Sequence, residues 1–152
     1  MIPDFKEDGN LPMEGHPHAA TWQEVKNRFC QGDHRSEIAK KLLSLLKRAK
    51  DCRFKRVIMM GSFVTAQERP KDFDLIWLTD PELELSNLSK HCKELVDASK
   101  SRDRFGCDLL SCPENSEMLG ELVSHERGFG IDKNTKKPRG LVILDLVNDE
   151  LS

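Results

Sequence analysis

Two aspartates, Asp72 and Asp74, stand at the start of a predicted strand and have the spacing of metal ligands. Residues two apart in a strand project to the same face, so we expect the two carboxylates side by side. Like charges at that distance repel one another, and a cation between them relieves the repulsion. Carboxylate oxygens suit Mg²⁺ or Mn²⁺. The pair therefore predicts a divalent-metal site at this strand.

A Gly61-Ser62 turn precedes these aspartates by nine residues and follows the apolar run Val57-Ile58-Met59-Met60. Glycine lets the backbone approach a phosphate closely, and free N–H groups at a turn or helix start attract anions. The Ser62 hydroxyl adds a further donor. Arg69 and Lys71 border the carboxylates and either contact phosphates or offset the local negative charge. The pattern predicts a phosphate-binding turn at Gly61 and Ser62, with Arg69 and Lys71 as further candidates for phosphate contact.

A third acid, Asp108, interrupts the apolar run Phe105-Gly106-Cys107-Asp108-Leu109-Leu110. An unpaired carboxylate is costly to bury. If this run forms a strand beside the one that carries Asp74, Asp108 reaches the same metal and helps to activate an attacking hydroxyl. Two alternatives remain open: a solvent-facing position at a sheet edge, or a structural ion pair with Arg102 or Arg104.

The elements around these residues predict one α+β (α/β mixed) domain, with a small mixed β-sheet flanked by helices. Residues 1–152 form this domain, and residues 1–20 are an extended N-terminal arm packing on it. Thr21 and Glu24 make a capping box for the first helix, and Ser36 caps the second. Predicted helices cover 21–29, 36–50, 81–98 and 114–124; predicted strands cover 53–60, 72–78, part of 102–111, and 140–147, the last with a helix start as its alternative.

Composition narrows the classes of function. Charged residues make up 33% of the chain, but the net charge is only −2. The protein as a whole is therefore not basic enough to indicate nucleic-acid binding, although nucleic acid is not excluded as a partner. No run of about 18 apolar residues and no signal-like start occur, so we expect a cytoplasmic protein with reduced thiols and no membrane partner. The five cysteines form no CxxC pair, which argues against a zinc ribbon, and Cys92 and Cys107 are expected to be buried.

A basic segment late in the chain contains Lys133, Lys136, Lys137 and Arg139. It lies in a polar stretch with two glycines and a proline, which predicts a loop. Its cations either bind a triphosphate or polynucleotide, or simply face solvent.

Taken together, Met60-Gly61-Ser62, the nine-residue spacer, Asp72-Phe73-Asp74 and the later Asp108 resemble the DNA polymerase beta-like nucleotidyltransferase superfamily. The spacer also looks like that family's loop, with a short helix and then Pro70 before the first acid. The small size is similar to minimal bacterial nucleotidyltransferases, often the antitoxin partners of small helical toxins. The opening arm resembles an uncharacterised bacterial group within the superfamily. The motif region covers about residues 53–111.

The resemblance implies a nucleotidyltransferase fold and transfer of a nucleoside monophosphate from an NTP, with ATP the expected donor, to a hydroxyl of a protein, RNA or small molecule. It implies that Asp72, Asp74 and Asp108 are catalytic and bind Mg²⁺ or Mn²⁺, while Gly61 and Ser62 hold the triphosphate. No residue set distinguishes ATP from other triphosphates. The alternative is an inactive or weakly active antitoxin-like or regulatory binding module, with a small helical toxin as a possible partner.

Overall fold

Strands β2 (Arg56–Met60) and β3 (Asp74–Thr79) lie antiparallel at the centre of the sheet, with Ile58 paired to Ile76. The computed structural model describes residues 1–71, 73–126 and 128–152. The apolar side chains of both strands are buried. Continuous apolar runs of this kind are typical of strands that are covered on two faces. Both predicted strands are therefore confirmed.

The sheet has five strands in the order β1-β5-β2-β3-β4 and mixes parallel with antiparallel pairs. Strand β5 (Val142–Asp145) is antiparallel to β2 and parallel to β1 (His18–Ala20). Strand β4 (Leu109–Pro113) runs parallel to β3 on the other side. The predicted α+β class with a small mixed sheet is confirmed, and residues 142–145 form a strand rather than a helix start.

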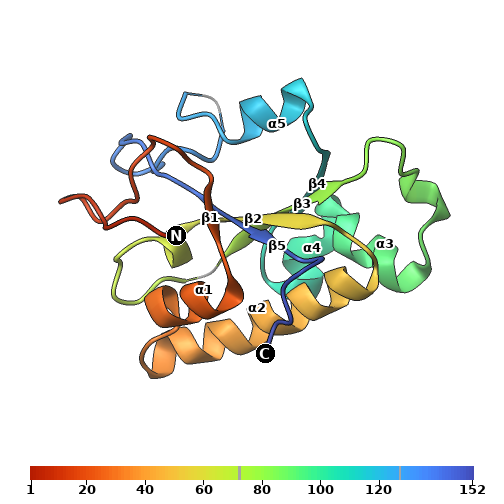
Figure 1. The fold of residues 1–152 in the computed structure, drawn as a ribbon, viewed down its shortest axis with the longest axis horizontal. Coiled ribbons are helices and arrows are strands. Elements are labelled where there is room, and N and C mark those ends of the chain that lie inside the picture. Colours follow the sequence, from red (N-terminus) through yellow and green to blue (C-terminus); the bar gives the residue numbers. More distant parts are fainter. Residues whose placement is uncertain (72, 127) are drawn as a thin grey trace.

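Helices cover both faces of this sheet. Figure 1 shows α1 and α2 on one face and α5 on the other, with α3 and α4 under β3 and β4 on the same side as α2. Among the described residues, none of the helices combines the length and apolar character needed to cross a bilayer. The helices are α1 (Trp22–Phe29), α2 (Asp33–Asp51), α3 (Lys90–Val96), α4 (Ala98–Phe105) and α5 (Glu117–Leu122), with single 3₁₀ turns η1 (Ser62–Val64) and η2 (Leu85–Asn87).

Successive side chains of the central strands point to opposite faces of the sheet and pack in two separate apolar clusters. Val57, Met59 and Trp77 belong to the larger cluster, which also contains the buried faces of α1 and α2. Ile58 and Ile76 belong to the smaller one, against which α5 packs. Side chains two apart share a face, so Asp74 projects toward the α5 side with Ile76. The alternation of side chains along β3 therefore places the candidate site on the face of the sheet that α5 covers.

Several predicted boundaries are wrong for local reasons. Helix α2 starts at Asp33 with Gly32 at its N-cap, and the Ser36 hydroxyl instead donates to the Cys30 carbonyl. Residues 81–98 do not form one helix: the Asp80 carboxylate accepts the Glu82 N–H in a turn, and α3 begins after its own cap, Ser89.

The segment predicted to hold the third strand is divided between a helix and a strand. Helix α4 extends to Phe105 and ends at Gly106, whose left-handed backbone (φ 75°) terminates it. Strand β4 therefore starts only at Leu109, and Asp108 lies just before it. The correction matters because Asp108 belongs to the approach to the strand, not to its middle.

The N-terminal arm packs on the sheet and adds a strand to it. Leu11 is fully buried and forms a β-bridge with Gly140. His18 donates its backbone N–H to the Leu141 carbonyl over 2.7 Å. The His16 Nδ1 accepts the Leu141 N–H over 3.3 Å. The arm is thus fixed along β5.

Lowering the pH below about 6.5 is expected to loosen this arm. Burial, together with the charges of His18 and His125, lowers the pKa of His16 from its ordinary value of 6.5. A depressed histidine pKa means that the unfolded chain takes up the proton first, so stability is complete above pH 6.5 and falls below it. The protection factor of the Leu141 amide, which is its hydrogen-exchange rate corrected for the intrinsic pH dependence, should fall between pH 7.5 and 5.5. His16→Asn keeps an acceptor without titrating, and an unchanged pH dependence in that variant would refute this role.

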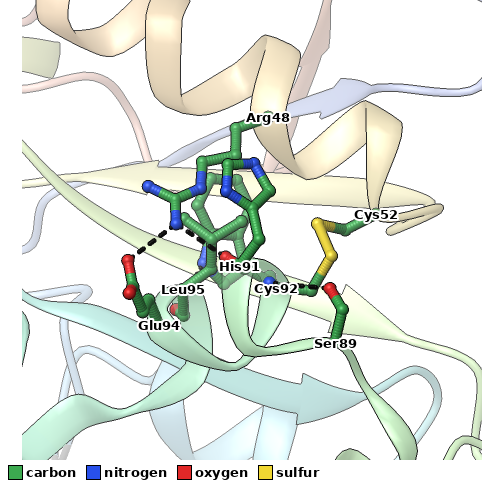
Figure 2. Close-up of a disulfide and its surroundings, with 8 residues drawn as sticks. Arg48, Cys52, Ser89, His91, Cys92, Glu94 and Leu95 are labelled. Atoms are coloured by element: carbon green, nitrogen blue, oxygen red, sulfur yellow. Dashed lines mark hydrogen bonds and ion pairs between the residues drawn. A yellow bond between two sulfur atoms is a disulfide. The ribbon is translucent and has the colours of Figure 1, made fainter.

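A disulfide joins the end of α2 to α3. Cys52 and Cys92 are 40 residues apart in sequence and are bonded, with their Cα atoms 5.8 Å apart. Figure 2 shows the Arg48 guanidinium beside this bridge, donating to the His91 carbonyl over 2.7 Å and to Glu94 over 2.8 Å. The expectation of reduced thiols is therefore wrong for this pair, since α2 and α3 bring the two sulfurs together. Cys107 is buried, as predicted.

Candidate functional site

The candidate site lies at one end of the sheet, where β2 ends and β3 and β4 begin. Met60 of β2 pairs with Asp74 of β3, and Leu75 pairs with Leu109 of β4. The turn after β2 and the residue before β4 therefore meet around Asp74. Because β2 is antiparallel to β3, the end of β2 lies beside the start of β3. Because β4 is parallel to β3, the start of β4 lies there as well.

Asp74 and Asp108 are in direct contact at this end of the sheet. The Asp108 N–H donates to Asp74 Oδ1 over 2.9 Å, and the Leu75 N–H donates to the Asp108 carbonyl over 3.0 Å. Asp108 lies two positions before Leu110, which packs against the same cluster as Ile76, so strand alternation places its side chain on the face of Asp74. The predicted approach of the third acid to the second is present in the structure.

Arg102, in the last turn of α4, neutralises both acids. Its Nη2 lies 2.8 Å from Asp108 Oδ2 and 3.4 Å from Asp74 Oδ1. The alternative of an ion pair between Asp108 and Arg102 is thus also realised. The Arg102 side chain is 55% exposed, so solvent screens these pairs and a change of rotamer breaks them at small cost.

The Gly61-Ser62 turn faces Asp74 across a cavity of about 210 Å³. Gly61 has a left-handed backbone (φ 87°), which favours glycine, and Ser62 starts η1. Thr65 closes the turn, since both its N–H and its hydroxyl donate to the Ser62 carbonyl. The cavity residues are Gly61, Ser62, Gln67, Asp74, Phe129, Ile131, Asp132, Lys133, Asn134 and Arg139. Two of these, Lys133 and Arg139, come from the basic loop noted in the sequence.

Arg35 of α2 fixes the chain that follows this turn, a role that the sequence did not reveal. Its guanidinium donates to the carbonyls of Phe63 and Thr65 over 2.8 Å each and to that of Gln67 over 2.6 Å. It also lies 5.5 Å from the centroid of the Phe63 ring. An arginine at the start of a helix carries no sequence signal for such contacts, because the partners are backbone carbonyls.

Replacing Arg35 with Lys is expected to destabilise the protein by about 2 kcal/mol, since one ammonium cannot reach carbonyls spread along the segment. Urea unfolding should measure the loss. Arg104→Lys on the exposed face of α4 is the matched control and should leave the midpoint unchanged. An Arg35→Lys midpoint equal to the wild-type midpoint would show that these contacts do not hold the segment.

Three further residues predicted for the site are not placed in the cavity by the described part of the structure. Arg69 and Lys71 are exposed, and neither is among the residues that line the cavity. Asp72 lies outside the described residues. Among residues 1–71, 73–126 and 128–152, no group of three or more His, Cys, Asp or Glu side chains is placed to hold a metal ion. The described part of the site therefore contains Asp74 and Asp108 in contact, the Gly61-Ser62 turn and the basic loop.

Comparison with known proteins gives a family but no activity. Residues 3–145 match the model of the family described as "Family of unknown function (DUF6932)". No curated protein and no solved structure shows significant similarity to the chain. Because the match spans most of its length, the chain belongs to the DUF6932 family.

Proposed function

We propose that this protein is a metal-dependent nucleotidyltransferase with a nucleotidyltransferase fold, which transfers a nucleoside monophosphate from an NTP to an acceptor hydroxyl. The observation that carries the proposal is the contact between Asp74 and Asp108, 34 residues apart, opposite the Gly61-Ser62 turn. Asp74 lines the small polar cavity together with Gly61 and Ser62, and Asp108 contacts Asp74 from the start of the neighbouring strand. Acids beside a glycine-serine turn match the requirements of phosphoryl-transfer chemistry. ATP is the expected donor and the cytoplasm the expected compartment.

The donor chemistry of the site fits Mg²⁺ or Mn²⁺. Asp74 and Asp108 supply carboxylate oxygens, which these ions prefer. Both carboxylates already attract the positively charged Arg102, which indicates a local demand for a cation. Asp74 and Asp108 would hold the ion, together with Asp72 as the sequence predicts. When bound, a divalent ion would neutralise phosphate charge and lower the pKa of an acceptor hydroxyl.

The protein's own groups then have distinct tasks. The Ser62 hydroxyl donates to an oxygen of the triphosphate, and Gly61 gives the phosphates room because it has no Cβ. Asp108 orients the acceptor, whose oxygen forms a bond to the α-phosphorus as the bond from that phosphorus to the β-bridging oxygen breaks. Pyrophosphate leaves, and the acceptor proton passes to a nearby base or to solvent. Positioning and charge neutralisation supply most of the rate in such transfers.

Labelled ATP tests the reaction class. The protein is incubated with Mg²⁺, candidate protein, RNA and small-molecule acceptors, and ATP labelled at either the α- or the γ-phosphorus. Nucleotidyl transfer places the α-label on the acceptor and the γ-label in pyrophosphate. Appearance of the γ-label on the acceptor would instead identify a kinase-type transfer, and no transfer to any acceptor would count against the enzyme.

A second candidate, an antitoxin-like or regulatory binding module without catalysis, is favoured by Arg102. Its guanidinium bridges the two acids, so its positive charge can take the place of the metal in a protein that no longer reacts. Mn²⁺ titration of wild type and Arg102→Ala separates the two functions. The enzyme predicts binding to both proteins, tighter in Arg102→Ala, whereas the binding module predicts no binding to the wild type.

A further inference from the structure

The loop after α5 forms the second wall of the cavity that faces Gly61 and Ser62. Phe129, Ile131, Lys133 and Asn134 line it from this side. The segment is about 70 residues away from Ser62 in sequence, so only the fold brings the two walls together. Figure 1 shows this part of the chain on the same side of the sheet as α5.

The loop is held in one conformation by Asp132. The Asp132 carboxylate accepts the Asn134 N–H over 2.9 Å and forms an ion pair with Arg139 Nη2 over 2.9 Å. Arg139 Nε also donates to Asn10 Oδ1 over 2.9 Å, which ties the loop to the N-terminal arm. The side chains of this ion pair are largely buried: that of Asp132 is 18% exposed and that of Arg139 is 14% exposed. Lys133, next to Asp132, is therefore presented by a fixed backbone.

The charges at Asp132 are consistent with this fixed loop. Burial alone would raise the pKa of Asp132, but N–H donors from Asn134 and Thr135 and the charge of Arg139 outweigh it and hold the pKa below its ordinary value. The carboxylate is thus ionised at neutral pH. It balances the charge of Arg139, as Arg102 balances that of Asp74.

Lys133 brings a positive charge to this wall. Its Nζ lies 6.0 Å from the centroid of the Phe129 ring, a contact that neutralises no charge. The cavity volume of about 210 Å³ is smaller than a pocket for a whole drug-sized ligand, which typically has about 300 Å³ or more. The cavity can hold part of a nucleotide. Lys133 on one wall and the Gly61-Ser62 turn on the other are suited to bind its phosphates.

We propose that Lys133 binds the polyphosphate of a nucleoside triphosphate from the side opposite Gly61 and Ser62. This assignment rests on the proposed function for the identity of the ligand. The backbone of η1 approaches the phosphates from one wall, and the Lys133 ammonium reaches them from the other. Asp132 and Arg139 also line the cavity, and their ion pair positions the loop.

Calorimetric titration of the full chain with Mg-ATP, inorganic tripolyphosphate and adenosine tests the proposal. Lys133→Ala should weaken binding of ATP and tripolyphosphate about 10- to 100-fold, the range for one charge-assisted hydrogen bond. Adenosine binding should not change. Lys137→Ala is the matched control, because this exposed lysine of the same loop does not line the cavity, and it should bind as the wild type does.

Equal affinities of Lys133→Ala and wild type for ATP would overturn the proposal, as would a wild type that binds neither ATP nor tripolyphosphate. Binding of tripolyphosphate without ATP would also overturn it, because the ligand would then be free polyphosphate. Lys133-dependent ATP binding with no transfer to any acceptor would support this site and count against the proposed reaction. Thermal unfolding of both variants at the wild-type midpoint would show that neither substitution changes the stability of the fold.

Discussion

Replacing Asp74 with Asn is expected to reduce nucleotidyl transfer about 10³-fold, equivalent to about 4 kcal/mol of transition-state stabilisation. The substitution removes the charge that attracts a metal ion. The amide keeps an oxygen that can accept the Asp108 N–H, so the contact between the starts of β3 and β4 is retained. The rate of α-label transfer from ATP to an acceptor measures the loss.

Asp103→Asn is the matched control for this prediction. Asp103 is an exposed acid beside Arg102 on α4, so its substitution makes the same change of charge near the site without removing a carboxylate from it. Its transfer rate should equal that of the wild type. Comparable losses of rate in both variants would mean that the reaction depends on the overall negative charge of this surface and not on metal binding by Asp74.

Reducing the Cys52–Cys92 disulfide is expected to destabilise the protein by about 4 kcal/mol. The bond closes a loop with a sequence separation of 40 residues, and its removal returns that conformational freedom to the unfolded chain. The melting temperature should fall on the order of 10 °C. Differential scanning calorimetry with and without dithiothreitol measures the change.

Cys52→Ser should match the reduced wild type and show no further response to dithiothreitol. Cys30→Ser is the control, because burial raises the pKa of the Cys30 thiol to about 11 and keeps it largely un-ionised and unreactive at neutral pH. It should retain the wild-type response to reduction. A wild-type melting temperature that does not respond to dithiothreitol would show that the disulfide does not form or does not stabilise this fold.

Local patterns predicted the elements that carry the candidate site. The apolar runs before Gly61 and after Asp74 are long enough to indicate buried strands, and both strands are present. The Thr21 and Glu24 capping box also forms as predicted. These features depend on neighbours in sequence, so one chain suffices to recognise them.

The boundary before β4 was not predictable because the signals compete locally. Phe105 and Cys107 suggest a strand, yet Gly106 ends a helix there, and both readings fit the sequence. The outcome depends on packing of α4 against β4 and not on propensity. The prediction that Asp108 approaches Asp74 still held, because it required only that β4 lie beside β3.

Long-range contacts account for what the sequence could not reveal. Arg35 binds backbone carbonyls, Lys133 reaches the cavity by the path of the loop, and Cys52 meets Cys92 through the placement of two helices. None of these depends on a periodic pattern or a fixed spacing. Asp108 contacts both Asp74 and Arg102, and its role as a metal ligand stays a prediction.

The proposed enzyme requires Asp74 and Asp108 to bind a divalent ion opposite a phosphate-binding turn. A crystal structure with Mn²⁺ and a non-hydrolysable ATP analogue tests it most directly. We predict an anomalous peak about 2.1 Å from carboxylate oxygens of both residues, with Arg102 displaced and the phosphates at Gly61 and Ser62. Saturating Mn²⁺ and nucleotide with no anomalous peak at the acids, and Arg102 still bridging Asp74 and Asp108, would contradict this proposal.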